Sequence, residues 1–394
     1  MSMPAQGLSG PGIRVAHPPP LSLYVHMPWC VRKCPYCDFN SHELRGELPE
    51  ARYIEALVSD LEAALPWVWG RRVRSVFLGG GTPSLLSERG LETCLPALRT
   101  RLPWEPEAEV TLEANPGTFE SARFAAYREA GVNRLSVGIQ SFSDRHLQGL
   151  GRIHDAAAAH RAAEIAARHF ANFNLDLMFG LPEQSPDEAL ADVRAALSHG
   201  PTHLSCYQLT LEPNTPFYHR PPVLPEHDLV AGMEEAIAAW LAEAGFGHYE
   251  TSAYARPGFR CAHNLNYWTF GDYLGIGAGA HSKLTLQDRV VRQMRHRHPE
   301  AYMKGALQGN AVQETHNVAL ADLPFEFMMN AMRLCEGVPL SLYEQRTGLS
   351  LATVLPVLDR VEALGLVARD WQTLRPTVRG QRFLNELLQH FLPE

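Results

Sequence analysis

The sequence has no long apolar run. None of its 394 residues lies in an apolar stretch close to the roughly 20 residues that a transmembrane helix requires, so no transmembrane segment is expected. The first twenty residues contain glycine, proline and serine with few apolar side chains, unlike a secretory signal peptide. We expect residues 1–20 to form a flexible tail.

Positive charge is scarce. The chain has 35 Lys and Arg against 43 Asp and Glu, a formal net charge of -8. Such a surface repels the phosphates of nucleic acids, so no nucleic-acid partner is expected. The one dense basic stretch is Arg292–His298, which we expect to be a solvated loop, with a site for an anionic group as the alternative.

Cysteine is also sparse. The chain has 7 cysteines, an odd number, and Cys94, Cys206, Cys261 and Cys335 are scattered. This pattern does not favour a disulfide framework. Unpaired cysteines are typical of a reducing compartment, so we expect the protein in the cytoplasm.

The other three cysteines lie together. Cys30, Cys34 and Cys37 have the spacing C-x3-C-x2-C and follow residues 24–29 (Tyr-Val-His-Met-Pro-Trp), which predict a strand that stops at a proline. Four-iron clusters are normally held by four cysteines. Three thiolates on one loop would therefore hold a [4Fe–4S] cluster and leave one iron open to another ligand.

Two other interpretations of the three cysteines stay open. A structural zinc site would need a fourth ligand, which His26 or His42 would have to supply, and the spacing is unusual for zinc. A redox pair of Cys34 and Cys37 would leave Cys30 without a role. The iron–sulfur interpretation accounts for all three.

Strands and helices alternate between residues 21 and 212. The predicted strands are rich in β-branched and apolar residues and are Leu21–Met27, Ser75–Leu78, Glu109–Glu113, Arg134–Ile139, Asn174–Met178 and His203–Thr210. The predicted helices have apolar residues three or four apart and are Ala51–Leu65, Glu88–Leu98, Phe119–Ala130, Ala156–His169 and Asp187–Ser198. Six such units imply a parallel sheet, and we expect an α/β fold, a partial (β/α)6 barrel over residues 21–245 that includes a further helix, Asp228–Ala244.

The rest of the chain has a different pattern. Residues 246–320 are rich in Gly, His, Tyr and Trp and are expected to connect two domains. Residues 321–394 predict a small, α-rich, winged-helix-like domain with helices Leu340–Thr347, Leu351–Leu364 and Thr377–Leu392 and a hairpin near 366–374. The segment carries too little positive charge for DNA, so a docking or lid role is expected instead.

The cysteine spacing resembles that of the radical S-adenosylmethionine (SAM) superfamily. This resemblance implies that SAM chelates the open iron and that a 5′-deoxyadenosyl radical can form from it. Motifs at the carboxyl ends of the strands, the active face of such barrels, would then surround SAM.

Several residues at these strand ends suit SAM. The run Gly79-Gly80-Gly81-Thr82-Pro83 would let the backbone approach the methionine moiety closely. Asp176 lies inside an apolar run and would be satisfied by ribose hydroxyls or by a core hydrogen bond to the backbone. The other candidates are Glu113 and Gln140 at strand ends, Arg152 as a partner for a carboxylate, and Phe39 for stacking on adenine, with ordinary strand-end and packing roles as alternatives.

Longer motifs make the resemblance specific to one branch of this superfamily. Residues 24–30, 79–83, 113–116 (Glu-Ala-Asn-Pro), 138–142 and 176–182 are similar to the oxygen-independent coproporphyrinogen III oxidases and their relatives. In that branch the equivalents of Glu113, Gln140, Arg152 and Asp176 bind SAM, and Tyr24 belongs to the same cofactor-binding set. The resemblance covers roughly residues 21–390.

Two groups within this branch differ. The oxidases extend the motif to C-x3-C-x2-C-x-C and have a longer N-terminal segment, whereas here Phe39 stands in place of the fourth cysteine. Cys-Pro-Tyr-Cys-Asp-Phe instead resembles the HemW group of heme chaperones. We therefore expect a heme carrier, with the oxidase as the alternative and enzymatic activity left open.

A second motif supports the HemW resemblance. His263-Asn264-Leu265-Asn266-Tyr267-Trp268 resembles the H-N-x-x-Y-W heme-binding motif of that group. An imidazole can ligate iron and the aromatic pair would cover a macrocycle, whereas a packed loop is the alternative. Cys261 and His281 are further candidate ligands. The resemblance implies heme, recipient hemoproteins and a reductant such as flavodoxin or ferredoxin as partners.

Overall fold

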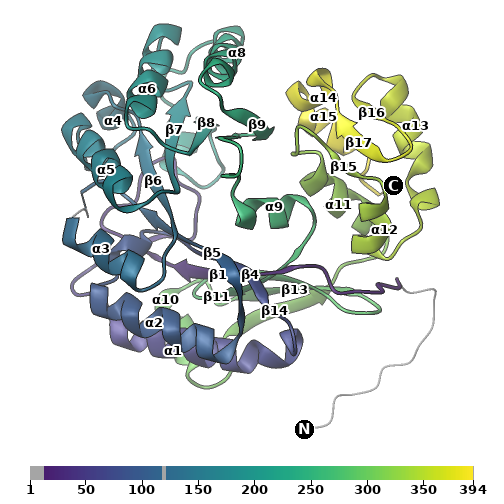
Figure 1. Cartoon of the computed structure of the whole chain (residues 1–394), viewed down its shortest axis with the longest axis horizontal. Helices are drawn as coiled ribbons and strands as arrows, with labels where there is room; N and C mark the ends of the chain where they lie inside the picture. Colours follow the sequence, from purple (N-terminus) through teal and green to yellow (C-terminus); the bar gives the residue numbers. More distant parts are fainter. Residues whose placement is uncertain (1–12, 118–120, 394) are drawn as a thin grey trace.

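The computed structural model describes residues 13–117 and 121–393. Six parallel strands pair in chain order, namely β1 (Leu21–Met27), β4 (Val73–Gly80), β5 (Trp104–Ala114), β6 (Arg134–Gln140), β7 (Phe173–Phe179) and β8 (His203–Gln208). Helices cover their outer side, as Figure 1 shows: α1 (Glu50–Ala64), α2 (Glu88–Arg101), α3 (Ser121–Glu129), α5 (Ala156–His169), α6 (Pro186–Ser198) and α8 (His227–Glu243). The expected partial barrel is confirmed. The predicted start of the third helix, Phe119, lies outside the described residues.

The two faces of this sheet differ in polarity. Leu23 and Val25 of β1 are fully buried in the main core with the apolar residues of α1, and each such side chain contributes about 1.5–3 kcal/mol of burial. The alternate residues Ser22 and Tyr24 face the interior and lie beside Ser75 and Phe77 of β4. Ser22 and Ser75 are joined there by a hydrogen bond of 2.7 Å. The interior is therefore polar enough to receive a polar ligand.

The sheet continues through the segment that was expected only to connect two domains. Beyond β1 lie β11 (Asp272–Ile276), β12 (His281–Thr285), β13 (Val290–Arg295) and β14 (Val312–Asn317), and beyond β8 lie β10 (Ala253–Ala255) and β9 (Gly247–Glu250). The expectation of a solvated loop at Arg292–His298 was wrong, because its first four residues belong to β13. Arg295 is fully buried and pairs with Asp60 of α1 at 3.3 Å, a partner too distant in sequence to foresee.

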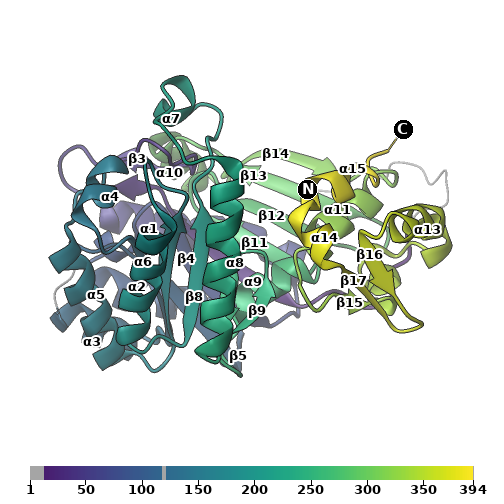
Figure 2. The same ribbon diagram turned by 90° about the horizontal axis from the view of Figure 1, so that it is seen from above.

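The C-terminal domain has its own hydrophobic core and stands beside the barrel (Figures 1 and 2). Its elements are α11 (Leu323–Ala331), β15 (Val338–Pro339), α12 (Ser341–Thr347), α13 (Leu355–Ala363), β16 (Val367–Arg369), β17 (Thr373–Pro376), α14 (Val378–Arg382) and α15 (Leu384–Gln389). The helices and the hairpin were expected, although the last helix is divided in two near Phe383. Figure 2 shows that β12–β14 extend toward this domain.

Part of the expected flexible tail is packed. Ile13 and Val15 are only 4% and 6% exposed and belong to the C-terminal core. Residues 1–12 lie outside the described residues. Short elements complete the chain, namely β2 (Trp29–Cys30), β3 (His42–Glu43), α4 (Asp144–Gly149), α7 (Pro216–His219), α9 (Ala262–Trp268), α10 (Pro299–Ala306) and 3-10 turns at Leu65–Val68, Pro83–Leu85 and Leu351–Thr353.

Candidate cofactor site

One pocket of about 370 Å³ lies at the carboxyl ends of the strands. It brings together most of the residues that the sequence singled out: Cys30, Cys34, Cys37, Phe39, Gly80, Gly81, Thr82, Glu113, Gln140, Arg152 and Asp176. Tyr24, Gly79 and His263 are not in its lining. A pocket of this size lies in the range of small-molecule sites.

The cysteine loop is held against the glycine run by backbone hydrogen bonds. The amide of Gly81 donates to the carbonyl of Met27 at 2.6 Å, and the amide of Thr82 donates to that of Trp29 at 2.7 Å. A Cβ atom at Gly81 would lie 2.5 Å from the Trp29 oxygen, so only glycine allows this approach. The glycine run therefore positions the cysteine loop as well as lining the pocket.

The three thiols suit an iron–sulfur cluster better than a single ion. Burial raises the pKa of Cys30 and of Cys37, which favours neutral thiols until a metal centre displaces the protons. Among the described residues, no three His, Cys, Asp or Glu side chains are drawn together closely enough to hold one metal ion. A cluster binds each cysteine at a different iron, so three separated thiols facing one pocket fit it.

Two partly buried carboxyl groups face this pocket. Glu113 accepts a hydrogen bond from the amide of Gly80 at 3.1 Å, and burial, followed by the nearby charge of Asp176, raises the pKa of Glu113 to about 8. Asp176 accepts hydrogen bonds from Ser136 at 3.0 Å and from Asn174 at 2.8 Å. These side-chain partners hold Asp176 at the pocket wall.

Arg152 connects the cysteine loop to the strand ends. Its guanidinium donates to Asn115 at 2.7 Å, to the carbonyl of Gly138 at 2.9 Å and to the sulfur of Cys34 at 3.6 Å. Gln140 has a φ of 68°, an uncommon value for a residue other than glycine, which bends the chain where β6 ends at the pocket.

The structure adds pocket residues that sequence reasoning missed. Asn115 and Tyr207 both line the pocket. Asn115 follows Glu113 in the Glu-Ala-Asn-Pro motif and was within reach of the same strand-end argument. Tyr207 gave no such signal, because an aromatic residue near the end of an apolar strand is usually part of a core.

Tyr24 and Gly79 support the pocket from behind. The hydroxyl of Tyr24 is 3.0 Å from Nδ1 of His26, whose Nε2 is 2.9 Å from the carbonyl oxygen of Asn40 in the cysteine loop. A Cβ atom at Gly79 would lie 3.1 Å from a carboxylate oxygen of Glu113. In this structure Tyr24 therefore positions His26, and the missing side chain of Gly79 leaves room for the Glu113 carboxylate.

His263 is enclosed, at 1% exposure. Its Nδ1 is 3.0 Å from the hydroxyl of Ser75, and its ring stacks on Phe77 with centroids 4.9 Å apart. Its Nε2 has no hydrogen-bond partner, and burial followed by the charge of Arg134 lowers the pKa of His263 to about 3. The imidazole is therefore neutral and able to ligate iron, but other side chains surround it.

The aromatic neighbours of His263 are packed as well. Tyr267 contacts Tyr273 with ring centroids 4.4 Å apart, and Trp268 lies under the guanidinium of Arg333 at 4.4 Å. Cys261 is buried and donates from its sulfur to Glu109 at 3.5 Å. The flat open surface expected beside His263 is not formed in this structure.

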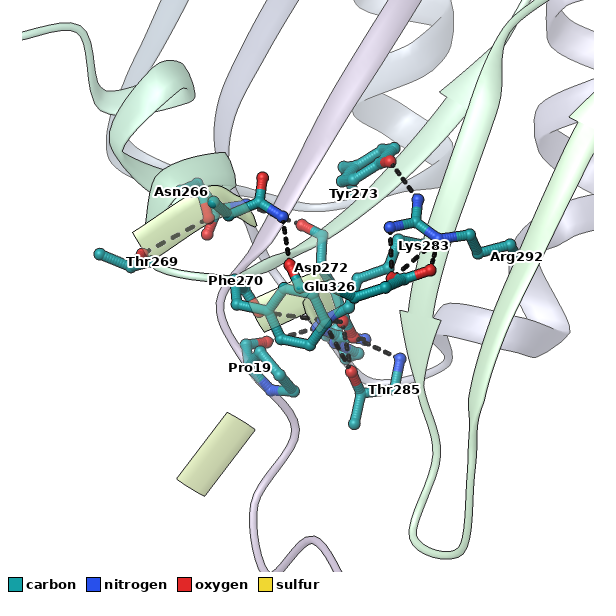
Figure 3. Close-up of polar contacts among 12 residues, drawn as sticks. Pro19, Asn266, Thr269, Phe270, Asp272, Tyr273, Lys283, Thr285, Arg292 and Glu326 are labelled. Atoms are coloured by element: carbon teal, nitrogen blue, oxygen red, sulfur yellow. Dashed lines mark hydrogen bonds and ion pairs between the residues drawn. The ribbon is translucent and has the colours of Figure 1, made fainter. Parts of the chain in front are cut away.

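Hydrogen bonds fix α9 to the sheet and the sheet to the C-terminal domain (Figure 3). Asn266 donates to the carbonyl of Asp272 at 2.8 Å, and the Asp272 carboxylate pairs with the buried ammonium of Lys283 at 3.1 Å. On the neighbouring strand Arg292 pairs with Glu326 of α11 at 2.6 Å and bonds to Tyr273. Opening the region around His263 would therefore disturb a connected polar network.

None of the helices in the part of the chain that the structure describes is long and apolar enough to cross a membrane.

Comparisons with known proteins agree with this geometry. The family model of the Radical SAM superfamily matches residues 24–196, and that of the HemN C-terminal domain matches residues 318–383. In solved structures, the coproporphyrinogen III oxidase HemN of Escherichia coli, a radical SAM enzyme, superimposes with a TM-score of 0.79 at 24% identity, covering 95% of this chain and 90% of that one. That likeness establishes the fold.

Relatives found by sequence identify the family more narrowly than the shared fold does. The heme chaperone HemW of Escherichia coli (strain K12) is 50% identical over 378 residues, which are 95% of this chain and 99% of that protein. The heme chaperone HemW of Haemophilus influenzae is 48% identical over 382 residues, with the same two coverages. The mouse mitochondrial radical S-adenosyl methionine domain-containing protein 1 is 37% identical over 387 residues, 95% of this chain and 87% of that one. The chain therefore belongs to the HemW family of the radical SAM superfamily.

Proposed function

We propose that this protein is a heme chaperone, which binds heme and delivers it to hemoproteins, built on a core that carries a [4Fe–4S] cluster and SAM. The observation that carries the proposal is the similarity to HemW proteins over nearly the whole chain, at up to 50% identity among the relatives above. The exposed Phe39 supports it, since the oxidases have a cysteine at that place. In this proposal residues 21–245 bind the cofactors and residues 246–320 contribute to heme binding. Residues 321–394 act as a lid or as a docking domain.

The pocket residues have separate roles in cofactor binding. Cys30, Cys34 and Cys37 would hold the cluster, and Arg152 would donate a hydrogen bond to the sulfur of Cys34. Glu113 would accept a hydrogen bond from the amino group of SAM, and Asp176 would accept hydrogen bonds from its ribose. Gly79, Gly80, Gly81, Thr82 and Gln140 would shape the pocket, Tyr24 would position Asn40 beside the cysteine loop through His26, and Phe39 would cover the adenine.

The cofactors supply one-electron chemistry when bound, and the protein's own contribution is enclosure. The pocket is lined by apolar and polar groups that fix a ligand and limit the access of water. The binding roles proposed above hold whether or not SAM is cleaved in the working cycle.

Heme would contact His263, the histidine of the H-N-x-x-Y-W string. A neutral imidazole with a free Nε2 is the required ligand chemistry, and Ser75 on Nδ1 fixes the tautomer. Since the ring is enclosed, α9 must move away from Phe77 before a macrocycle can reach it. His281, which is exposed at the start of β12, is the next candidate ligand.

The remaining partners follow from this function. The recipients would be hemoproteins, a small electron-transfer protein such as flavodoxin or ferredoxin would reduce the cluster, and the protein would act in the cytoplasm beside porphyrin biosynthesis. The free cysteines of the described chain are consistent with a reducing compartment.

An anaerobic assay separates the carrier from the oxidase. Cluster-loaded protein is titrated with heme, and a second sample is incubated with coproporphyrinogen III, SAM and reductant. The carrier predicts saturable heme binding with about one heme per chain, as one axial imidazole suffices, and no decarboxylated porphyrinogen. Absence of heme binding together with formation of vinyl groups would assign the oxidase instead.

A further inference from the structure

A second cavity lies beside the cysteine loop. It has a volume of about 640 Å³ and is formed by the segment from β2 to β3 and by the start of α10. His42, Leu44, His298, Pro299, Met303 and Trp29 are in its lining. Only Ser41 is common to the two linings, so this groove is separate from the site described above.

His42 has the surroundings of a metal-binding imidazole. Burial lowers its pKa, while a hydrogen bond to the backbone carbonyl of Arg297 acts in the opposite direction. The other ring nitrogen, Nε2, is buried and has no hydrogen-bond partner. Histidines that ligate metals usually donate one N–H to a carbonyl and keep the other nitrogen for the metal. The fold holds His42 in this arrangement.

The groove offers more than one ligand atom. The ring of His298 lies 5.6 Å from that of His42 between centroids, and His298 is exposed. Met303 places a thioether in the lining and is 2% exposed, and Trp29 supplies an aromatic wall at 8% exposure. Imidazole and thioether are the axial ligands that proteins give to heme iron, and apolar walls suit its macrocycle.

The charges at the rim are mixed. Lys33 and Arg45 are positive, and Lys33 is held by the carbonyls of Phe39 at 3.0 Å and Ser41 at 3.2 Å. Glu43, Glu47 and Glu300 are negative, and Glu300 is paired with Arg52 at 2.7 Å. The exposed Arg297 lies next to the groove. The three cations can pair with carboxylate groups of a ligand such as heme propionates.

We propose that this groove is a heme-exchange site, in which His42 is an axial ligand and His298 the second imidazole. The inference rests on the proposed function and names a site that the chaperone would use to load and release heme. In the groove the imidazole of His298 is exposed, whereas the side chain of His263 is enclosed between α9 and β4. Nε2 of His42 is buried, so this ring must turn toward the groove when heme binds.

The position of the groove connects it to the cysteine loop. The amide of His42 donates to the carbonyl of Pro28 at 2.7 Å, and the amide of Leu44 donates to that of Cys30 at 2.9 Å. A ligand bound at His42 therefore acts on β3, which pairs with the strand β2 that carries Cys30. Heme in the groove is expected to alter the spectrum of the bound cluster.

The test is an anaerobic heme titration of the full, cluster-loaded chain, followed by its Soret band. The variants are His42→Gly, His298→Ala and His263→Ala, and His316→Ala on the exposed strand β14 is the matched control. We expect His42→Gly to weaken binding by more than roughly tenfold, the scale reached even by loss of an outer partner at metal sites. Added imidazole should restore the Soret band of His42→Gly, which no purely structural defect would allow.

The outcomes are distinct. Loss in His42→Gly with rescue by imidazole, and a weaker loss in His298→Ala, supports the groove. Parent-like binding in both variants with loss only in His263→Ala overturns the groove and leaves the chaperone function intact. If the parent binds no heme, both the groove and the proposed function are overturned. The iron content of each variant shows whether it keeps its cluster. If His42→Gly loses the cluster, His298→Ala tests the groove instead, because it changes an exposed side chain.

Discussion

The cofactor pocket and the α9 segment were both predicted from short motifs, but in the structure they differ in how accessible their residues are. At the pocket, eleven of the predicted residues line one cavity that is open to a ligand. At α9, His263 is 1% exposed and its aromatic neighbours are packed on protein. A motif thus identifies the chemistry that residues can perform, and only the packing around them shows whether a ligand can reach them.

The difference has a physical origin. The carboxyl ends of parallel strands cannot pair further, so loops diverge there and leave space. Helix α9 instead lies between the interior face of the sheet and the C-terminal core, to which its Leu265 and Trp268 contribute contacts. Binding at the first region requires little rearrangement, whereas binding at the second must first break existing contacts.

The largest expected effect is loss of the cluster. In the triple variant Cys30→Ala, Cys34→Ala, Cys37→Ala, the brown absorbance and the bound iron should disappear, because no thiolate remains in the pocket. Cys335→Ala, outside the pocket, is the control and should keep its iron. A full complement of iron in the triple variant would refute the assignment of the pocket.

The next largest effect concerns SAM. Asp176→Asn keeps the shape of the side chain but removes the charge and one acceptor from the pocket, so SAM affinity should fall by about tenfold, equivalent to about 1.4 kcal/mol. The cluster absorbance should not change. Calorimetry on the cluster-loaded protein gives the affinity, with the exposed Asp228→Asn on α8 as control. Equal affinities in both variants would exclude Asp176 from the site.

A smaller effect is a dependence of SAM binding on pH. Burial, reinforced by Asp176, raises the pKa of Glu113 to about 8, so this carboxyl is mainly protonated at neutral pH in the free protein. The amino group of SAM donates a hydrogen bond that favours the Glu113 carboxylate, so binding should release a proton from Glu113, and affinity should rise as pH increases from about 6 to 8. Calorimetry in buffers of different ionisation enthalpy measures the release. Glu113→Gln should reduce the number of protons released, and an unchanged release in that variant would assign the proton to another group.

The smallest expected effect tests how α9 is held closed. Arg292→Ala removes a half-buried pair with Glu326 and should lower the stability of the C-terminal domain by about 1–3 kcal/mol. Heme should then reach His263 faster in stopped-flow experiments. Arg260→Ala breaks a more exposed pair with Glu336 and should cost under about 1 kcal/mol. Equal heme binding rates in both variants and the parent would show that this contact does not limit access.

Much of the barrel could be predicted because its signals are local. Alternation of strands and helices, together with polar residues where apolar runs stop, is enough to place Glu113 and Asp176 at one face of the sheet. The extension of the sheet could not be predicted in this way. Arg295 is buried in a strand, where its charge is paired with that of Asp60, more than two hundred residues earlier. Likewise, His263 on α9 is enclosed by Ser75 and Phe77 of strand β4, which are not part of the motif.

Heme transfer is the measurement that tests the central claim most directly. Heme-loaded protein is mixed anaerobically with an apo-hemoprotein, and the Soret band of the acceptor is followed against a scavenger that traps only dissociated heme. A chaperone predicts transfer that is faster than the trapping and depends on the concentration of the acceptor. Transfer at the rate of spontaneous dissociation, whatever the acceptor concentration, would contradict the claim that this protein delivers heme.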